Sequence, residues 1–246
     1  MSYRHARAAL LTGAALVLAS CGGGGGSDDS APAPITSFEL LDPNPGAGNR
    51  FGQDVAILAN GNVVVTAPRD STVAPNSGAV HLYNPRTQAR IASIFGDTAN
   101  DRLGSSVTAL ANGNFVIASP NDDVGGVVDA GSVMLINGAT GAQIGSTIAG
   151  GAAGDRLGSR VTALANGNFA ITSPSDVGGV VNAGSVMLFN GATGAQIGST
   201  IAGTAAGDVI AAEVAGSATG DFYVLGLGRA DKNGVVDSGL ARVIAQ

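Results

Sequence analysis

Short runs of apolar residues recur along most of the chain, separated by polar and glycine-rich segments, and the whole arrangement repeats. The stretch from Asp101 to Gly150 is nearly identical to the stretch from Asp155 to Gly203, which gives a period of 52 to 54 residues. A period of this length is typical of stacked architectures built from one supersecondary unit. The sequence therefore predicts a repeat protein.

Each repeat contains four candidate strands joined by recognisable turns. Asn112-Gly113 predicts a two-residue hairpin turn after the first strand, because Asn and Gly tolerate the positive φ angles that such a turn needs. Pro120 ends the second strand, since proline cannot donate to a β-ladder. In the first of the two similar copies the expected strands are 105–110, 115–119, 132–136 and 142–148.

The second and third candidate strands are apolar without alternation, as in Phe115-Val116-Ile117 and Val133-Met134-Leu135-Ile136. A sheet with one wet face would alternate apolar and polar residues. These strands are therefore expected to be covered on both faces. Blades stacked around an axis meet that requirement, and a two-layer sandwich does not.

The chain provides about four such units. Three of them span residues 50–95, 101–149 and 155–202. A more divergent fourth copy begins at Asp208 and retains two recognisable strands, at 222–225 and 240–245. The expected fold is all-β, a small β-propeller of about four four-stranded blades. Residues 35–41 precede the first unit and are expected to supply an N-terminal strand that closes the last blade. A closed ring would be a monomer; the alternative is an open half-ring that pairs with a second copy as a homodimer.

The N-terminal segment resembles a bacterial lipoprotein signal peptide. Arg4 and Arg7 precede a short apolar run at 8–19, which is too short for the roughly 20 residues that span a bilayer. The run closes on Leu18-Ala19-Ser20-Cys21, which is similar to a lipobox. We expect a signal peptide at 1–20 and lipid attachment at Cys21. The alternative is an ordinary secretory signal that happens to contain a cysteine.

The segment 21–34 combines the lipidated cysteine with a Gly-, Ser- and Pro-rich composition typical of a tether, and the repeat domain occupies 35–246. In the sorting of bacterial lipoproteins, a residue such as Gly22 after the lipidated cysteine favours the outer membrane. The domain could face the cell surface or the periplasm. Cys21 is the only cysteine, so the chain forms no internal disulfide.

Charge excludes one class of partner. The formal net charge is −6, and residues 1–20 contain two arginines and no acid, so the remainder is two units more negative. An acidic body disfavours nucleic acid and broad contact with anionic lipid. The membrane is expected to be contacted through the N-terminal lipid only.

The first unit resembles the FG-GAP repeats of integrin-α-like β-propellers. This unit contains Phe51-Gly52, Val55-Ala56, Thr66-Ala67-Pro68 and the run 78–83 in the order found in the family. In the next two units the Phe-Gly pair at the start of the repeat is replaced by Leu103-Gly104 and Leu157-Gly158. The resemblance implies a propeller that serves as an interaction module.

Two departures from the family limit what the resemblance implies. Its propellers usually have about seven blades, more than this chain supplies. Many members also carry a calcium loop between the first two strands of a blade. Here that connection is only 110–114, too short to surround a cation that takes about six to eight oxygen ligands. Calcium binding is therefore not expected at this connection, and no metal site and no cofactor are predicted. The alternative is a weak cation site at Asp122, Asp123 and Asp129.

Candidate binding residues gather on one side of the predicted blades. The connections from second to third strand, and from fourth strand to the next blade, leave the same face, and long polar loops on a rigid scaffold commonly carry binding sites. The alternative is that these residues cap turns or form solvated pairs. The charged residues of these loops in units two and three are Asp101, Arg102, Asp122, Asp123, Asp129, Asp155, Arg156 and Asp176.

The sequence offers little for catalysis. The only histidine after the signal peptide, His81, lies on a strand and is expected to be packed, and the chain has no Gly-x-Ser-x-Gly motif. No catalytic residue is predicted. The leading hypothesis is a membrane-anchored, non-enzymatic envelope lipoprotein whose propeller binds a protein or glycan. The alternatives are a structural spacer in the periplasm and, last, an envelope hydrolase.

Overall fold

The structure is a computed structural model that describes residues 37–174, 183–203, 206, 213–217, 222–227 and 240–245. The chain divides into two compact units, Met1–Leu41 and Asp42–Gln246. The described part of the first unit, residues 37–41, has no regular secondary structure. Every strand within the described residues belongs to the second unit. None of the described residues lies in a helix long and apolar enough to cross a membrane.

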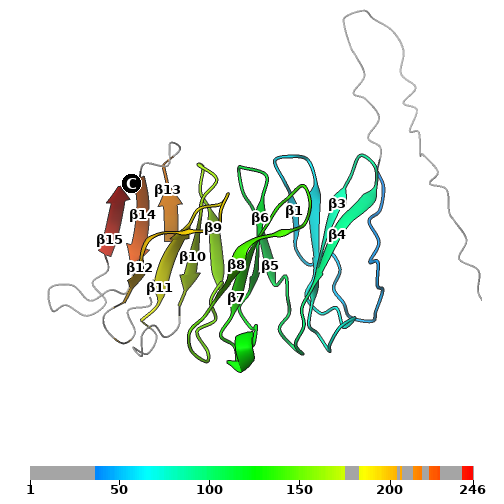
Figure 1. Cartoon of the computed structure of the whole chain (residues 1–246), viewed down its shortest axis with the longest axis horizontal. Helices are drawn as coiled ribbons and strands as arrows, with labels where there is room; N and C mark the ends of the chain where they lie inside the picture. The colour runs from blue at the N-terminus through cyan, green and yellow to red at the C-terminus, as the bar shows by residue number, and fades with distance from the viewer. Residues whose placement is uncertain are drawn as a thin grey trace, which may run out of the picture. The chain divides into compact units, whose positions relative to one another are not determined.

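The second unit is all-β, as predicted, and is built from antiparallel sheets whose strands pair in chain order (Figure 1). The first sheet comprises β1 (Val55–Ile57), β2 (Val63–Ala67), β3 (Ala79–Asn84) and β4 (Ala89–Phe95). The second comprises β5 (Ser106–Ala109), β6 (Phe115–Ser119), β7 (Ser132–Ile136) and β8 (Gln143–Ala149). The third comprises β9 (Arg160–Ala163), β10 (Phe169–Ser173), β11 (Ser185–Phe189) and β12 (Gln196–Ala202).

A fourth sheet comprises β13 (Glu213–Gly216), β14 (Phe222–Leu227) and β15 (Leu240–Ala245). It has three strands within the described residues. The predicted closing strand at 35–41 is not found: residues 37–41 pair with no strand, and Phe38 and Leu41 are 45 % and 73 % exposed. The local sequence has strand propensity, but such propensity depends on a partner edge to be realised. Residues 35 and 36 lie outside the described part.

The core consists of apolar layers between successive sheets. Phe115 and Ile117 point to the first sheet and pack on Val64 and Leu82, while Val116 points the other way into the layer shared with the third sheet. Every residue of β6 and β10 is buried. The prediction that these strands are covered on both faces is therefore confirmed. The sheets follow one another side by side in chain order (Figure 1).

The hairpin turn differs in detail from the prediction. The N–H of Gly113 donates to the carbonyl of Leu110 (3.1 Å), and the N–H of Leu110 donates to the carbonyl of Asn114 (2.9 Å). Only the glycine takes a left-handed φ, at 86°, while Asn112 does not. The connection is thus a three-residue loop in which glycine alone supplies the left-handed position, instead of a two-residue turn that needs two such positions.

The asparagines of these turns join neighbouring sheets. The side-chain amides of Asn112 and Asn114 both donate to the carbonyl of Gly191, in the turn between β11 and β12, at 2.8 and 2.9 Å. Asn60 and Asn62 make the same pair of bonds to Gly138 in the second sheet, at 2.9 and 2.8 Å. The repeated Asn-Gly-Asn sequence therefore fixes both the turn and the distance between sheets.

Replacing both Asn112 and Asn114 with alanine is expected to lower the free energy of unfolding by about 2 to 4 kcal/mol, because four side-chain hydrogen bonds are lost. Two of them donate to the Gly191 carbonyl, and the other two accept the N–H groups of Asn114 and Gly138. Urea unfolding followed by circular dichroism measures the change. Asn44→Ala is the control, since no hydrogen bond from its side chain is seen in the described residues. Equal stability of the double variant and the control would contradict the role of this pair.

Candidate functional site

The long loops of successive sheets meet on the side opposite the Asn-Gly turns. The β4–β5 loop contacts the β6–β7 loop, where the N–H of Asp123 donates to Oδ1 of Asp101 (3.2 Å). The β6–β7 loop in turn contacts the β8–β9 loop, where the N–H of Arg156 donates to the carbonyl of Asp129 (3.1 Å). The structure thus gathers seven of the eight candidate residues on one side of the sheets. The eighth, Asp176, lies outside the described residues.

Two of these aspartates hold the loops together. Asp101 is 2 % exposed, and its carboxylate accepts the N–H groups of Thr98 (2.9 Å) and Asp123. Asp155 is 9 % exposed, and its Oδ2 accepts the N–H groups of Gly151 and Ala152, both at 2.8 Å. These carboxylates replace backbone hydrogen bonds that the loops cannot make for themselves. The carboxylates of Asp101 and Asp155 are therefore not candidates for contact with a ligand.

The arginines that follow these aspartates adopt a left-handed backbone. Arg102 and Arg156 have φ of 53° and 50°, and Arg50 in the first unit has 58°. In this conformation the N–H of Arg102 donates to the carbonyl of Asn76 (3.1 Å), and the next N–H, of Leu103, donates to that of Ser77 (2.8 Å). The repeated motif thus ties each sheet to the preceding loop, while the arginine side chains remain exposed.

The remaining three aspartates are partly exposed and lie in the β6–β7 loop, which includes the short 3₁₀ turn η1 (Val124–Gly126). The hydroxyl of Ser132 donates to Oδ2 of Asp122. The N–H of Asp129 donates to Oδ1 of Asp123 (2.7 Å), and the amide of Asn121 donates to Oδ1 of Asp129 (3.0 Å). These bonds order the loop while its three carboxylates remain only partly buried.

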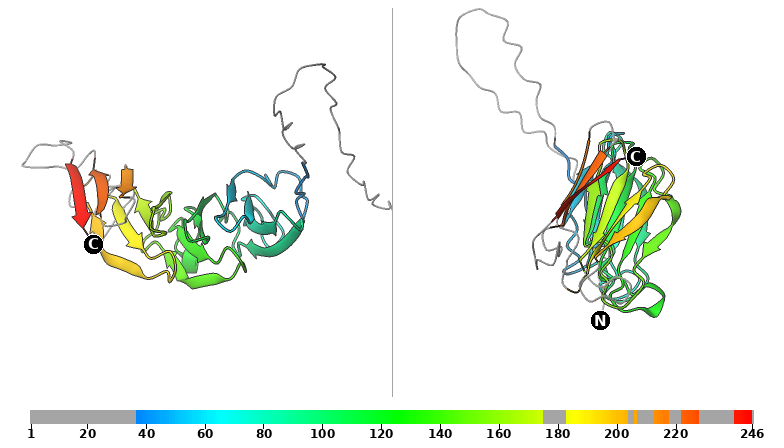
Figure 2. Two further views of the ribbon diagram at one scale, coloured as in Figure 1. Left: turned by 90° about the horizontal axis from the view of Figure 1, so that it is seen from above. Right: turned by 90° about the vertical axis from the view of Figure 1, so that its left-hand side faces the viewer.

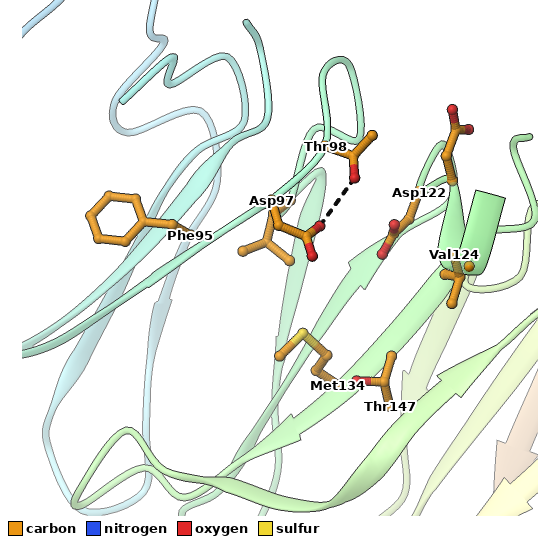
Figure 3. A pocket seen from close by; sticks show the side chains of 10 residues that line it. Phe95, Asp97, Thr98, Asp122, Val124, Met134 and Thr147 are labelled. Atoms are coloured by element: carbon orange, nitrogen blue, oxygen red, sulfur yellow. Dashed lines mark hydrogen bonds between the residues drawn. The ribbon is translucent and has the colours of Figure 1, made fainter. Parts of the chain in front are cut away.

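Two adjoining pockets open between the β4–β5 and β6–β7 loops, and Asp123 borders both. The larger, of about 300 Å³, is also lined by Asp97, Asp122, Phe95, Met134 and Thr147 (Figure 3). The smaller, of about 270 Å³, is lined by polar side chains of both loops. Those polar side chains are Asn100, Arg102, Asn121 and Asp129.

Sequence reasoning missed part of this site. Asp97, Phe95 and Met134 line the larger pocket but were not among the candidates. A signal existed for Asp97, because the matching position after β8 is Gly151. An acid present in only one of these two equivalent loops indicates a feature of that junction alone. The acidic pocket therefore belongs to the junction between the first two sheets.

Burial changes the acidity of this cluster. The pKa of Asp122 is raised, mainly because burial disfavours its charged form and further because Asp101, Asp97 and Asp123 are negative, while the Ser132 hydrogen bond opposes the rise. The pKa of Asp101 is raised by burial as well, against the hydrogen bonds from the backbone of Asp123 and Thr98. Both carboxyls thus hold a proton at higher pH in the folded chain than in the unfolded one.

Asp122→Asn should change the pH dependence of stability. A raised folded-state pKa means that the native chain binds more protons than the unfolded chain, so the ionised Asp122 lowers stability at neutral pH and this loss disappears as pH falls through its folded pKa. We expect the variant to gain stability relative to wild type at pH 7, with the difference shrinking toward pH 4. Urea midpoints at several pH values measure it; a difference independent of pH would contradict the assignment.

His81 is packed, as expected. It is fully buried on β3, with Nδ1 2.8 Å from the hydroxyl of Ser93 and with the rings of Phe51, Tyr83 and Phe95 around it. Burial lowers its pKa. Among the described residues, no three His, Cys, Asp or Glu side chains are grouped so as to hold a metal ion.

Comparisons with known proteins identify the repeats. The family model for the FG-GAP repeat matches residues 39–83, which contain β1 and β2 and nearly all of β3. A model described as a repeat of unknown function (DUF5650) matches residues 109–158 and 163–209, in the second and third sheets. No curated protein matches the chain.

Among solved structures, TolB from Acinetobacter baumannii is similar at 14 % identity and a TM-score of 0.38, over 78 % of this chain. The chain spans 43 % of the length of that protein. Residues 39–83 therefore match the FG-GAP repeat, and the antiparallel sheets of the chain have the form of β-propeller blades.

Proposed function

We propose that the chain is a non-enzymatic interaction module that binds a protein or a glycan of the cell envelope in the two adjoining pockets between the β4–β5 and β6–β7 loops. The observation that carries the proposal is the position of Asp123, which borders both pockets. Its loop is held by hydrogen bonds on either side and rests on fully buried strands. Such a loop presents its polar groups with little ordering cost on binding.

The chemistry of the lining suits a partner rich in hydrogen-bonding groups. Asp122 and Asp123 accept hydrogen bonds, Arg102 donates them, and Asn121 does both. Phe95 and Met134 add apolar surface beside them. Sugar rings combine hydroxyl groups with apolar faces, and protein surfaces offer the same combination.

A binding role is favoured over hydrolysis by how the carboxylates are used. A general acid–base pair needs two carboxyls free to exchange protons with a substrate. Asp101 is buried and its carboxylate accepts two backbone N–H groups, so it is not free for such an exchange. His81 is enclosed by aromatic rings.

The proposal places the module at the outer membrane, held by acyl chains on Cys21. The support is the sequence around Leu18-Ala19-Ser20-Cys21, where an apolar run ends on small residues and a cysteine. More than one acyl chain is needed for stable anchoring. Labelled palmitate should enter the wild-type chain and not Cys21→Ser; label in both variants, or in neither, would exclude attachment at this residue.

The binding site is tested by comparing a double variant at the pockets with a single arginine variant on the opposite side of the sheets. The full chain carrying Cys21→Ser is labelled and bound to cell envelopes of its source organism, with Asp123→Asn/Arg102→Ala compared with Arg86→Ala, an exposed arginine in the β3–β4 turn. We expect the double variant to bind at least about tenfold more weakly and Arg86→Ala to bind as wild type.

Pretreating the envelopes with protease or with periodate then assigns the partner as protein or glycan. If the double variant binds as tightly as wild type, the pockets are not the binding site and the proposed function fails at this location.

A further inference from the structure

The first sheet has a buried face that the second sheet does not cover. The second sheet packs on the opposite face, which carries Val64 and Leu82. Val65 and His81 are a cross-strand pair on the uncovered side, and Tyr83 follows two residues later on the same side of β3. We call this side the outer face of the first sheet. Its three residues are all buried, and His81 completely so.

Irregular chain ahead of β1 lies against the outer face. In Figure 1 and Figure 2 this segment, in blue, lies beside β3 and β4 at the end of the row of sheets. The ring of Phe51 is 5.9 Å from the ring of His81, and the carboxylate of Asp42 is near enough to influence the charge of His81. We call residues 42–51 the cover.

One buried asparagine holds the cover in place. The side-chain amide nitrogen of Asn49 lies 3.0 Å from Oδ2 of Asp42 and 2.8 Å from the carbonyl oxygen of Asn44, both within the cover. It also lies 3.2 Å from Oδ2 of Asp70, which is fully buried in the β2–β3 loop. In the next two units an aspartate holds the place of Asn49. This anchor therefore belongs to the first unit alone.

His81 has only one of its two ring nitrogens paired. Nδ1 is 2.8 Å from the hydroxyl of Ser93, whereas Nε2 has no hydrogen-bond partner among the described residues. The rings of Phe51, Tyr83 and Phe95 surround the imidazole. A protonated imidazole carries an N–H on both nitrogens. Protonation under the closed cover would bury a charge with an unpaired donor, which costs free energy.

Charged groups face His81 from three elements. Asp42 on the cover and Asp70 in the β2–β3 loop favour its protonated form, and Arg90 on β4 disfavours it. Tyr83 on β3 is neutral, since burial raises the pKa of its hydroxyl. Burial is the largest influence on His81 and lowers its pKa. In an open form, where His81 meets water, the pKa returns toward about 6.5.

We propose that residues 42–51 form an acid-sensitive cover on the outer face of the first sheet, which is released when His81 takes up a proton. The open form binds more protons than the closed form at pH values between the lowered pKa of the closed form and about 6.5. The closed form is therefore most stable above this window and loses stability as the pH falls through it. Release exposes the apolar surface of Phe51, Val65 and Tyr83 under acidic conditions.

The test compares how fast a thiol on the outer face reacts with a pyridyl disulfide at pH 7 and at pH 5. The full chain carries Cys21→Ser together with Val65→Cys. Val73→Cys, at a position 55 % exposed in the β2–β3 loop, gives the rate of an open thiol at each pH. Val116→Cys, at a position buried between the second and third sheets, reports opening elsewhere in the chain.

We expect the Val65→Cys rate, divided by the Val73→Cys rate, to rise about five- to 25-fold from pH 7 to pH 5, the upper limit being set by an open-form pKa of about 6.5. The same ratio for Val116→Cys should change less than about twofold. Adding His81→Asn should abolish the rise, because asparagine takes up no proton. His81→Phe is the second variant, since a phenyl ring suits the aromatic surroundings.

Three results would overturn the proposal. They are a Val65→Cys ratio that is equal at both pH values, a rise that Val116→Cys shares, and a rise that persists without His81. The second would indicate unfolding of the whole chain, and the third would indicate that Asp42 or Asp70 titrates instead.

Circular dichroism at both pH values confirms that each variant is folded. If neither replacement of His81 folds, the first two comparisons decide the proposal. None of these measurements involves a ligand of the loop pockets, so this proposal and the proposed function can fail separately.

Discussion

Replacing Gly138 with alanine is expected to destabilise the chain by about 3 kcal/mol. A Cβ atom at this position would lie 1.9 Å from the carbonyl oxygen of Gly113 and 2.6 Å from Cδ1 of Leu58. The oxygen belongs to the backbone of a hairpin and cannot move without shifting strands whose residues are packed on both sides. Overpacking of such a site is resisted because the surrounding structure is already close-packed.

The third sheet offers an independent copy of the same test. At Gly191 a Cβ atom would lie 1.8 Å from the carbonyl oxygen of Gly167, so Gly191→Ala should have a similar cost. Urea unfolding measures both. The matched control is Gly151→Ala, where the nearest atom to an added Cβ is Oδ2 of Asp155 at 3.9 Å.

The control is expected to change stability by less than about 1 kcal/mol, since alanine fits there and also restricts the unfolded chain. If all three variants had the same stability, the close approach of the turns would not be important for folding.

Replacing Phe169 with alanine is expected to cost about 3 to 5 kcal/mol, the usual range for a large aromatic side chain removed from a core. Phe169 is fully buried and stacks on Phe189, with ring centroids 5.5 Å apart and an interplanar angle of 18°. Both rings lie in the apolar layer between the second and third sheets, with Leu110 and Leu157. The cavity would weaken that junction, because in a repeat architecture each sheet packs only on its neighbours.

Phe38→Ala is the matched control for this prediction. Phe38 is 45 % exposed, so its removal should cost less than about 1 kcal/mol. Chemical denaturation measures both variants, and limited proteolysis shows whether cleavage of Phe169→Ala begins near the second and third sheets. A Phe169→Ala chain as stable as the control would mean that this layer contributes little to stability.

The strands could be predicted closely because their signals are local. Phe115–Ser119, Ser132–Ile136 and Leu240–Ala245 were expected from apolar runs bounded by turn residues, and β6, β7 and β15 have those bounds. The gathering of the charged loops on one side also followed from the order of antiparallel strands. Neither inference needs knowledge of which sheet packs on which.

The roles of individual loop residues could not be predicted, since they depend on contacts between different loops. Asp101 and Asp123 have the same chemistry in the sequence. Asp101 is buried by the neighbouring loop, whose N–H group it accepts, whereas Asp123 remains at the edge of two pockets. The acidic pocket formed with Asp97 depends on two loops that are distant in the sequence.

The repeat, the antiparallel blades and the burial of their central strands follow from the amino-acid sequence, because periodicity and turn chemistry act within about fifty residues. Three features become visible in the folded chain alone: residues 37–41 form no closing strand, Asp101 and Asp155 bind backbone, and Val224 and Val243 of the last sheet are exposed. Each of these outcomes depends on whether a second segment lies within contact distance, and an apolar strand has the same sequence pattern whether or not its partner is present.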